Sequence, residues 1–171
     1  LLTEKMLEEL LANADMRIRQ KAQFELVDRG VKGFDIFKSV AQNSNNQFAR
    51  IHAMWGMAQL ARENNALGGV FTTFLKDKDA EIIAQAAKLI GDVKYQAAAA
   101  DLVPLLTNGN DRVKFFAAEA LGRLKYTAAT ADIIKMLEVN NDQDVYLRHA
   151  GVLALSRFGA DEAAINLKNS P

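Results

Sequence analysis

The sequence contains no cysteine, and this absence excludes several kinds of site at once. Disulfides, thiolate metal sites, haem attached through cysteine and cysteine nucleophiles are ruled out within these 171 residues. The compartment stays open, because a periplasmic domain can also lack cysteine. Proline is scarce as well, with two residues, and strand-rich hairpins with Asn-Gly or Asp-Gly turns are not evident.

The chain also lacks an excess of either charge. Lysine plus arginine and aspartate plus glutamate both number 21, which gives a formal net charge of zero. Non-specific binding to nucleic acid or to an anionic membrane is therefore not expected, although a local basic patch stays open. No run approaches the roughly 18 apolar residues that a membrane-spanning helix needs, and no signal peptide is evident. A chain that begins at Leu1, already inside a helical pattern, is expected to be a piece of a longer protein.

What the sequence does contain is a recurring amphipathic helix, seen best in residues 111–124. Half of the chain is hydrophobic and a quarter is charged, as in packed proteins. In residues 111–124 an apolar stripe recurs at helical spacing: Val113, Ala117, Ala120, Leu121 and Leu124. Asn110 or Asp111 can cap the first turn, because a short side-chain oxygen accepts hydrogen bonds from free backbone N–H groups.

When the sequence is aligned with itself on Val113, this helix is seen to be one of five copies. The equivalent residues are separated by 31, 33, 31 and 34 positions: Ile18, Ala49, Ile82, Val113 and Leu147. Three residues earlier stand five strong N-cap formers: Asp15, Asn46, Asp79, Asn110 and Asp144. Four residues after the reference every copy has a small residue, and eight after it every copy has a large apolar one: Leu26, Met57, Ile90, Leu121 and Leu155.

This period, with two helices in each unit, predicts an α-solenoid. We expect an all-α, right-handed α-α superhelix of about five helix pairs, with the second helices on the concave side. Pro104 is expected to kink its helix or to mark a late turn. The whole chain, 1–171, is interpreted as one array whose units span about 3–30, 33–64, 66–94, 96–125 and 127–159, followed by a partial helix at 160–169.

The repeated pattern Asp-x-x-Val-Arg-x-x-Ala-Ala-x-Ala-Leu-Gly-x-Leu resembles HEAT repeats, in particular the short bacterial type. It is fullest in residues 110–124 and 79–93, while the first copy departs from it at Asp28 and Arg29. The signatures of tetratricopeptide and ankyrin repeats are absent. The HEAT resemblance implies a scaffold that binds proteins.

Residues 16–30 and 49–62 look like a narrower group. They resemble the HEAT segment of large secreted proteins of Bacteroidetes and Planctomycetes, which join a dehydrogenase-like propeller, a HEAT array and a haem-binding domain with Cys-x-x-Cys-His. That resemblance implies a periplasmic or extracellular parent, in which this segment acts as a spacer or docking surface. Haem would then belong to the parent, since the haem motif is absent here, and no cofactor is expected for these residues.

One residue after the reference, four of the five copies are basic: Arg19, Arg50, Lys114 and Arg148. They could form a ladder for an acidic ligand. The alternative is that each one caps, pairs or bridges repeats, and repetition in register favours this packing role.

The most individual segment is 48–62, which holds the only tryptophan. His52, Trp55 and Gln59 are spaced to share one helix face, which makes them a candidate partner-binding face together with Arg50 and Arg148. The alternative for Trp55 is that it fills a gap near the repeat interface. The two histidines, His52 and His149, fall in different columns, so a joint metal site is not expected.

No catalytic constellation or phosphate-binding loop stands out, so enzymatic activity is not expected of this segment. The predicted function is a non-catalytic interaction or spacer module whose partner is another protein or a neighbouring domain of the same chain. Two alternatives stay open. One is the HEAT group that attaches bilins to phycobiliproteins, and the other is a nucleic-acid-binding HEAT array.

Overall fold

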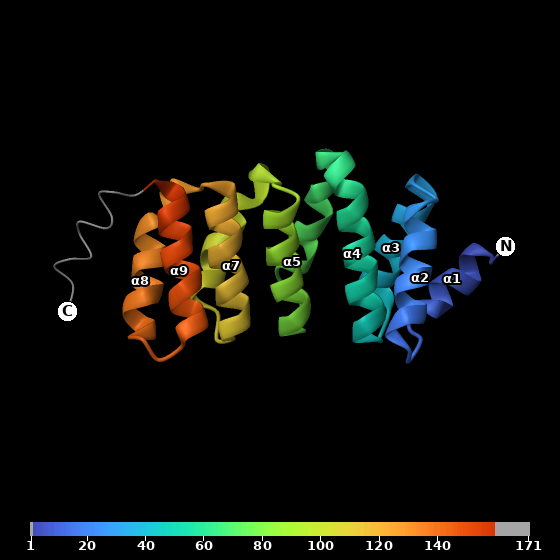
Figure 1. Ribbon diagram of the computed structural model, residues 1–171, viewed down its shortest axis with the longest axis horizontal. Coiled ribbons are helices and arrows are strands. Elements are labelled where there is room, and N and C mark those ends of the chain that lie inside the picture. The colour runs from blue at the N-terminus through green and yellow to red at the C-terminus, as the bar shows by residue number, and fades with distance from the viewer. Residues whose placement is uncertain (1, 160–171) are drawn as a thin grey trace. The chain divides into compact units, whose positions relative to one another are not determined.

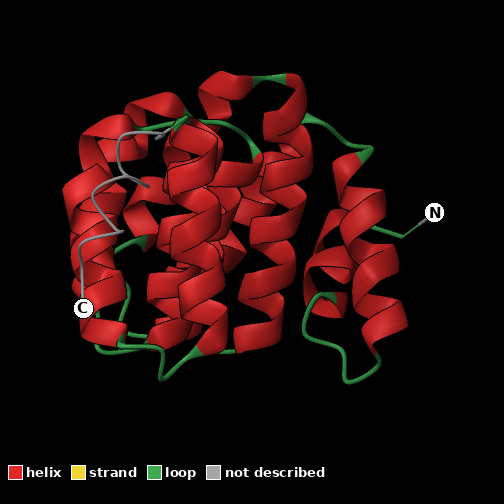
Figure 2. Ribbon diagram, turned by 60° about the vertical axis from the view of Figure 1, so that its left-hand side comes forward, coloured by secondary structure: helices red, strands yellow, loops and turns green. Residues whose placement is uncertain are grey.

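A computed structural model describes residues 2–159, and all of its regular elements are helices (Figures 1 and 2). The all-α fold class is therefore confirmed. The chain divides into two compact units at the Phe71–Thr72 bond, here called unit 1 and unit 2. Each unit is described separately.

Unit 1 contains two helix pairs. The first pair is α1 (Glu4–Leu10) and α2 (Met16–Val27), and the second is α3 (Val31–Asn43) and α4 (Gln47–Glu63). The second helices, α2 and α4, also pack against each other. A 3-10 segment, η1 (Asn65–Phe74), continues the chain towards unit 2.

Unit 2 is built around three second helices: α5 (Ala80–Asp92), α7 (Asp111–Leu124) and α9 (Val145–Phe158). Between α5 and α7 the chain forms η2 (Gln96–Ala98), α6 (Ala99–Leu102) and η3 (Val103–Thr107). Between α7 and α9 it forms η4 (Thr127–Ala129) and α8 (Thr130–Asn140). Figure 1 shows α5, α7 and α9 side by side in one layer, and α7 packs against both of its neighbours.

All five predicted N-caps start a second helix. Each side-chain oxygen accepts a hydrogen bond from a backbone N–H of the first turn, at between 2.7 and 3.3 Å, and two of the five caps accept from two such groups. These caps satisfy N–H groups that have no partner within their own helix. The column of large apolar residues is confirmed as core, since all five members are at most 6% exposed.

Small residues let the second helices approach closely. A Cβ built on Gly91 would lie 2.7 Å from the Ala120 Cα atom, and one built on Gly122 would lie 2.8 Å from the Ala154 Cα atom. Both distances are shorter than van der Waals contact and both involve backbone, which cannot move aside alone. Glycine at these two positions therefore sets the spacing of α5, α7 and α9.

Two ion pairs tie α5 to α7, one near each end. The Arg112 Nε atom donates to Glu81 Oε2 at 2.7 Å, and Arg123 Nη1 lies 3.0 Å from Asp92 Oδ1. Arg112 is exposed and Glu81 is half-buried, so the first pair contributes at most about 1 kcal/mol, whereas the Asp92 side chain of the second pair is only 9% exposed. Their role is to fix the register of the two helices.

The first helices of the third and fourth units are not continuous α-helices, and only the second of these two breaks was predicted. Residues 65–74 form a 3-10 helix, and Gly68 and Gly69 there disfavour a regular α-helix. At Pro104 the predicted change occurs: α6 ends at Leu102, and the 3-10 helix η3 follows, because proline has no N–H for an α-helical bond. The partial helix at 160–169 lies outside the described residues, and the single array and its concave side stay predictions.

Replacing Gly122 by alanine tests the close approach of α7 and α9. The new methyl group must push Ala154 away, and we expect the free energy of unfolding to fall by about 1–3 kcal/mol in urea denaturation. The matched control is Gly109→Ala in the turn before α7, where a Cβ meets nothing within 4 Å. An equal loss in both variants would contradict a packing role for Gly122.

Candidate partner-binding surface

Trp55 lies on α4, a helix that is otherwise mostly hidden. Ten of the 17 residues of α4 are buried, whereas the side chains of Phe48 and Trp55 are 57% and 38% exposed. Together with residues of α2 they form what we call the α2–α4 surface, which comprises Arg19, Gln23, Phe48, His52, Trp55 and Gln59. All six residues belong to unit 1.

Three members of this surface, Gln23, His52 and Gln59, form a polar chain that links the two helices. The Gln23 amide oxygen lies 2.8 Å from His52 Nδ1, and the Gln23 amide nitrogen donates to the Gln59 oxygen at 3.3 Å. Because an amide oxygen can only accept, Nδ1 of His52 carries the hydrogen. His52 and Gln23 are 4% exposed, so their hydrogen bonds satisfy groups that water barely reaches.

His52 is held in its neutral form. Burial lowers its pKa from 6.5 to about 4, and the positive charge of Arg19 adds to the shift. The imidazole also packs edge-on against Trp55, with ring centroids 5.0 Å apart. The network therefore positions the indole without placing a charge beneath it.

Arg19 and Phe48 extend the same surface along the two helices. The Arg19 Nη1 atom donates to the carbonyl oxygens of Asn13 and Ala14 at 2.7 and 2.9 Å. Its guanidinium carbon lies 4.7 Å from the centre of the Phe48 ring, which is a cation–π geometry. Arg19 thus closes the turn between α1 and α2 and supports an exposed aromatic ring of α4.

The contacts of the basic column support the packing interpretation. Arg50 is buried, and its Nε donates to the Ala41 carbonyl oxygen at 2.7 Å, much as Arg19 reaches the end of α1. In unit 2, Lys114 pairs with Asp111 at 2.5 Å and Arg148 lies 3.4 Å from Asp142. Arg19 and Arg50 thus donate to carbonyl oxygens that precede their own helices, and Lys114 and Arg148 pair with nearby aspartates. Such contacts stabilise the fold.

Of the five residues of the candidate face, the structure gathers three. His52 touches Trp55, and Gln59 joins them through Gln23. Arg50 is buried against α3, and Arg148 lies in unit 2. Sequence reasoning missed Gln23 and Phe48; Phe48 could have been noticed as an aromatic two residues after an N-cap, where the other copies vary.

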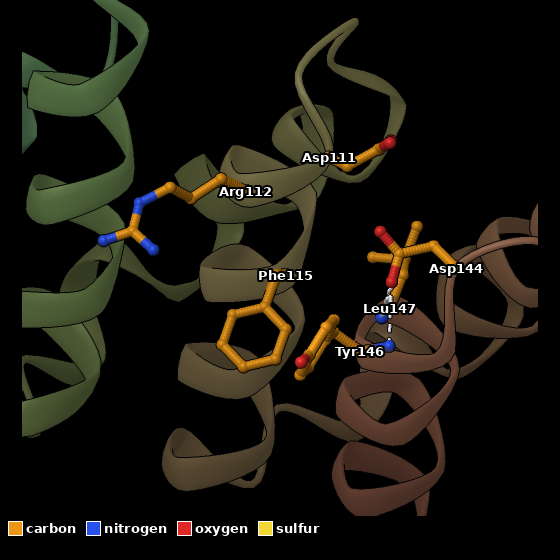
Figure 3. A pocket seen from close by; sticks show the side chains of 6 residues that line it. All are labelled: Asp111, Arg112, Phe115, Asp144, Tyr146 and Leu147. Carbon is orange, nitrogen blue, oxygen red and sulfur yellow. Dashed lines mark hydrogen bonds between the residues drawn. The ribbon is translucent and has the colours of Figure 1, made fainter.

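Unit 2 has a hollow of its own, between the N-terminal ends of α7 and α9. This α7–α9 hollow has a volume of about 310 Å³ and is lined by Asp111, Arg112, Phe115, Asp144, Tyr146 and Leu147. Figure 3 shows the rings of Phe115 and Tyr146 next to each other, with both aspartates above them and Arg112 pointing away towards α5. The sequence predicts only structural roles for Asp111, Asp144 and Leu147, and it singles out none of the six as part of a site.

Within residues 2–159, no group of three or more His, Asp or Glu side chains is placed to hold a metal ion. No helix in this part of the chain is long and apolar enough to cross a membrane.

Comparisons with known proteins support the repeat interpretation. Residues 69–147 match the family model of HEAT repeats. No curated protein sequence matches the chain. Among solved structures, the complex of CpcE and CpcF of phycocyanin lyase from Nostoc sp. PCC7120 is similar with a TM-score of 0.69 and 20% identity, over 98% of this chain and 69% of that one.

Two further structures are also similar. Human deoxyhypusine hydroxylase in complex with glycerol gives a TM-score of 0.60 at 16% identity; the match covers 92% of this chain and only 62% of that protein's length. An engineered protein gives 0.59 at 18% identity, over 92% and 79% of the two chains. Similarity at these identities shows the fold, a HEAT-like helical solenoid, and nothing about chemistry.

The lowered pKa of His52 predicts a pH-dependent stability. The unfolded chain binds a proton at His52 below about pH 6.5, whereas the folded chain does so only near pH 4. Stability is therefore full above pH 6.5 and is lost as the pH falls towards 4, by about 2 kcal/mol between pH 7 and pH 5. Urea denaturation at both values measures this loss.

The variant His52→Gln retains a donor towards Gln23 but cannot titrate, so it should lack this part of the pH dependence. His149→Gln changes the other, exposed histidine and serves as the control, which should behave as the wild type does. A wild-type pH dependence in His52→Gln would show that His52 is not the group responsible.

Proposed function

We propose that this chain is a non-catalytic protein-binding or spacer module of a larger protein, and that the α2–α4 surface contacts the partner. The observation that carries the proposal is the exposure of two aromatic side chains, Phe48 and Trp55, on helix α4, most of whose residues are buried. Aromatic side chains that stay partly exposed on a rigid support are typical binding hot spots.

The support beneath Trp55 strengthens this proposal. The polar chain of the buried His52 and Gln23 and the half-buried Gln59 fixes the position of the indole in the free protein. A side chain that is already ordered loses less conformational entropy when a partner binds. The exposed faces of Phe48 and Trp55 then supply apolar area, and the half-buried Gln59 supplies polar contacts at the edge.

The partner is proposed to be a separate protein or a neighbouring domain of the same chain. The resemblance of residues 16–30 and 49–62 to secreted propeller–HEAT–haem-binding proteins favours a domain neighbour and a periplasmic or extracellular parent. In that setting the module would hold redox domains at a fixed separation.

Bilin transfer is the second candidate, and the similarity to the CpcE–CpcF complex of phycocyanin lyase favours it. It predicts that this chain attaches a bilin to an apo-phycobiliprotein, which absorbance spectroscopy detects after mixing the three components. We expect no transfer. Nucleic-acid binding, the third candidate, has only the fold class in its favour, and filter binding at low salt tests it.

A photo-crosslinking amino acid in place of Phe48 in the full-length parent tests the main proposal. We expect one dominant crosslinked partner or domain. Val31 is the matched control, because it is an apolar residue of unit 1, 80% exposed, and lies outside the α2–α4 surface. The same products from positions 48 and 31 would contradict a specific surface.

Once the partner is captured, Trp55→Ala should weaken its binding by about 2 kcal/mol, or roughly 30-fold, because a partly exposed indole on an ordered support is a typical hot spot. Calorimetric titration measures the change, and Val31→Ala should leave the affinity within about twofold. Unchanged affinity in Trp55→Ala, with the fold intact by circular dichroism, would remove Trp55 from the interface.

A further inference from the structure

The α7–α9 hollow combines ring faces in its wall with carboxylates at its edge. We propose that it binds a lysine or arginine side chain of a peptide segment in a partner protein. Phe115, Tyr146 and Leu147 line its apolar part, and Asp111 and Asp144 contribute the negative charge.

The apolar wall fits the stem of such a side chain. Phe115 is half-buried, Leu147 is buried, and Tyr146 is 74% exposed, so the hollow is open at the Tyr146 side. Lysine and arginine bury their aliphatic stems along apolar surface while the charged head stays near water. Ring faces of phenylalanine and tyrosine also attract a cation directly.

The carboxylates retain capacity for a ligand. Asp144 uses one oxygen, Oδ1, to cap the N–H groups of Tyr146 and Leu147 at 2.7 and 3.0 Å. Its other oxygen, Oδ2, accepts no hydrogen bond from residues 2–159. Asp111 pairs with Lys114, and its side chain is 58% exposed. Asp144 can therefore offer Oδ2 to a cation at the mouth of the hollow, whereas Asp111 shares its charge with Lys114.

Arg112, the one basic residue in the lining, is already neutralised. Its guanidinium makes two hydrogen bonds to Glu81 of α5, at 2.7 and 3.2 Å, and lies 4.8 Å from the centre of the Phe116 ring. It points away from the hollow in Figure 3. Because Asp111 is paired with Lys114, the charge left for a ligand is mainly that of Asp144, and it favours a cation over an anion.

A second hollow makes a peptide a better occupant than a small free amine. It has a volume of about 540 Å³ and shares Asp111, Asp144 and Tyr146 with the first. The rest of its lining is Val139, Val145, Asn140, Gln143 and Lys114, the last of which is paired with Asp111. These two valines are 71% and 53% exposed. A peptide can place a basic side chain in the first hollow and an adjacent apolar residue against the valines.

This inference rests on the proposed protein-binding role only in taking the ligand to be a peptide. It concerns unit 2 and uses none of the residues of the α2–α4 surface. The two proposals are measured with different ligands and different variants, so either can fail alone.

NMR titration of the ¹⁵N-labelled chain tests the proposal with acetyl-Val-Lys-Val-amide. The expected result is a dose-dependent shift of the Tyr146 and Leu147 amide signals. Acetyl-Val-norleucine-Val-amide has the same stem without the charge and should bind about tenfold more weakly. Equal binding of the norleucine peptide, no shift at Tyr146, or equal binding of n-butylammonium would overturn a site for a basic peptide side chain.

Asp144→Asn is the decisive variant, because asparagine also caps helices and only the charge is lost. It should weaken the lysine peptide about tenfold, and Tyr146→Leu should weaken it about as much by removing a ring face. Asp142→Asn makes the same charge change at an exposed residue that does not line the hollow, so the lysine peptide should bind it as it binds the wild type. If Asp142→Asn weakens binding as much as Asp144→Asn does, the effect is one of net charge and the proposed site is wrong.

Discussion

The close approach of neighbouring second helices is the constraint on which unit 2 depends. Gly91 and Gly122 leave no space for a side chain against Ala120 and Ala154. With the backbones this near, the large apolar residues, such as Ile90 and Leu121, are sealed from water, and Arg112 and Arg123 reach the acids of α5. The small residues allow the helices to pack this closely, and the ion pairs and N-caps add to the stability of that packing.

The recurring positions stabilise the fold, and the variable positions lie at the candidate binding surfaces. Cap, small, large and basic residues recur because each repeat packs against its neighbours in the same way. The residue after each N-cap is only partly buried or exposed, and it varies: Met16, Gln47, Ala80, Asp111 and Val145. The next position holds Arg17, Phe48, Glu81, Arg112 and Tyr146. At that second position lie the Arg112–Glu81 ion pair, Phe48 of the α2–α4 surface and Tyr146 of the α7–α9 hollow.

Much of the fold could be predicted from the sequence because caps and periodicity are local. The five N-caps and the break at Pro104 follow from the chemistry of single side chains. The 3-10 form of residues 65–74 could not be predicted with the same ease, since glycine lowers helix propensity without dictating the alternative.

The candidate site was only partly predictable. His52, Trp55 and Gln59 share a helix face by spacing alone, but Gln23, which joins them, comes from another helix 29 residues before His52. The burial of Arg50 depends on the position of the Ala41 carbonyl, which is a tertiary fact. The hollow beside Phe115 and Tyr146 likewise needs two helices placed side by side.

The central claim is that recurring positions hold the fold while exposed, variable positions bind partners. An alanine scan of the second helices, with melting temperature and partner affinity measured for each variant, tests it most directly. The account predicts that alanine at Leu121 or Leu26 lowers the melting temperature most, whereas alanine at Phe48 or Trp55 lowers partner affinity with a smaller loss of melting temperature. Affinity losses that track melting temperature at every position would contradict it.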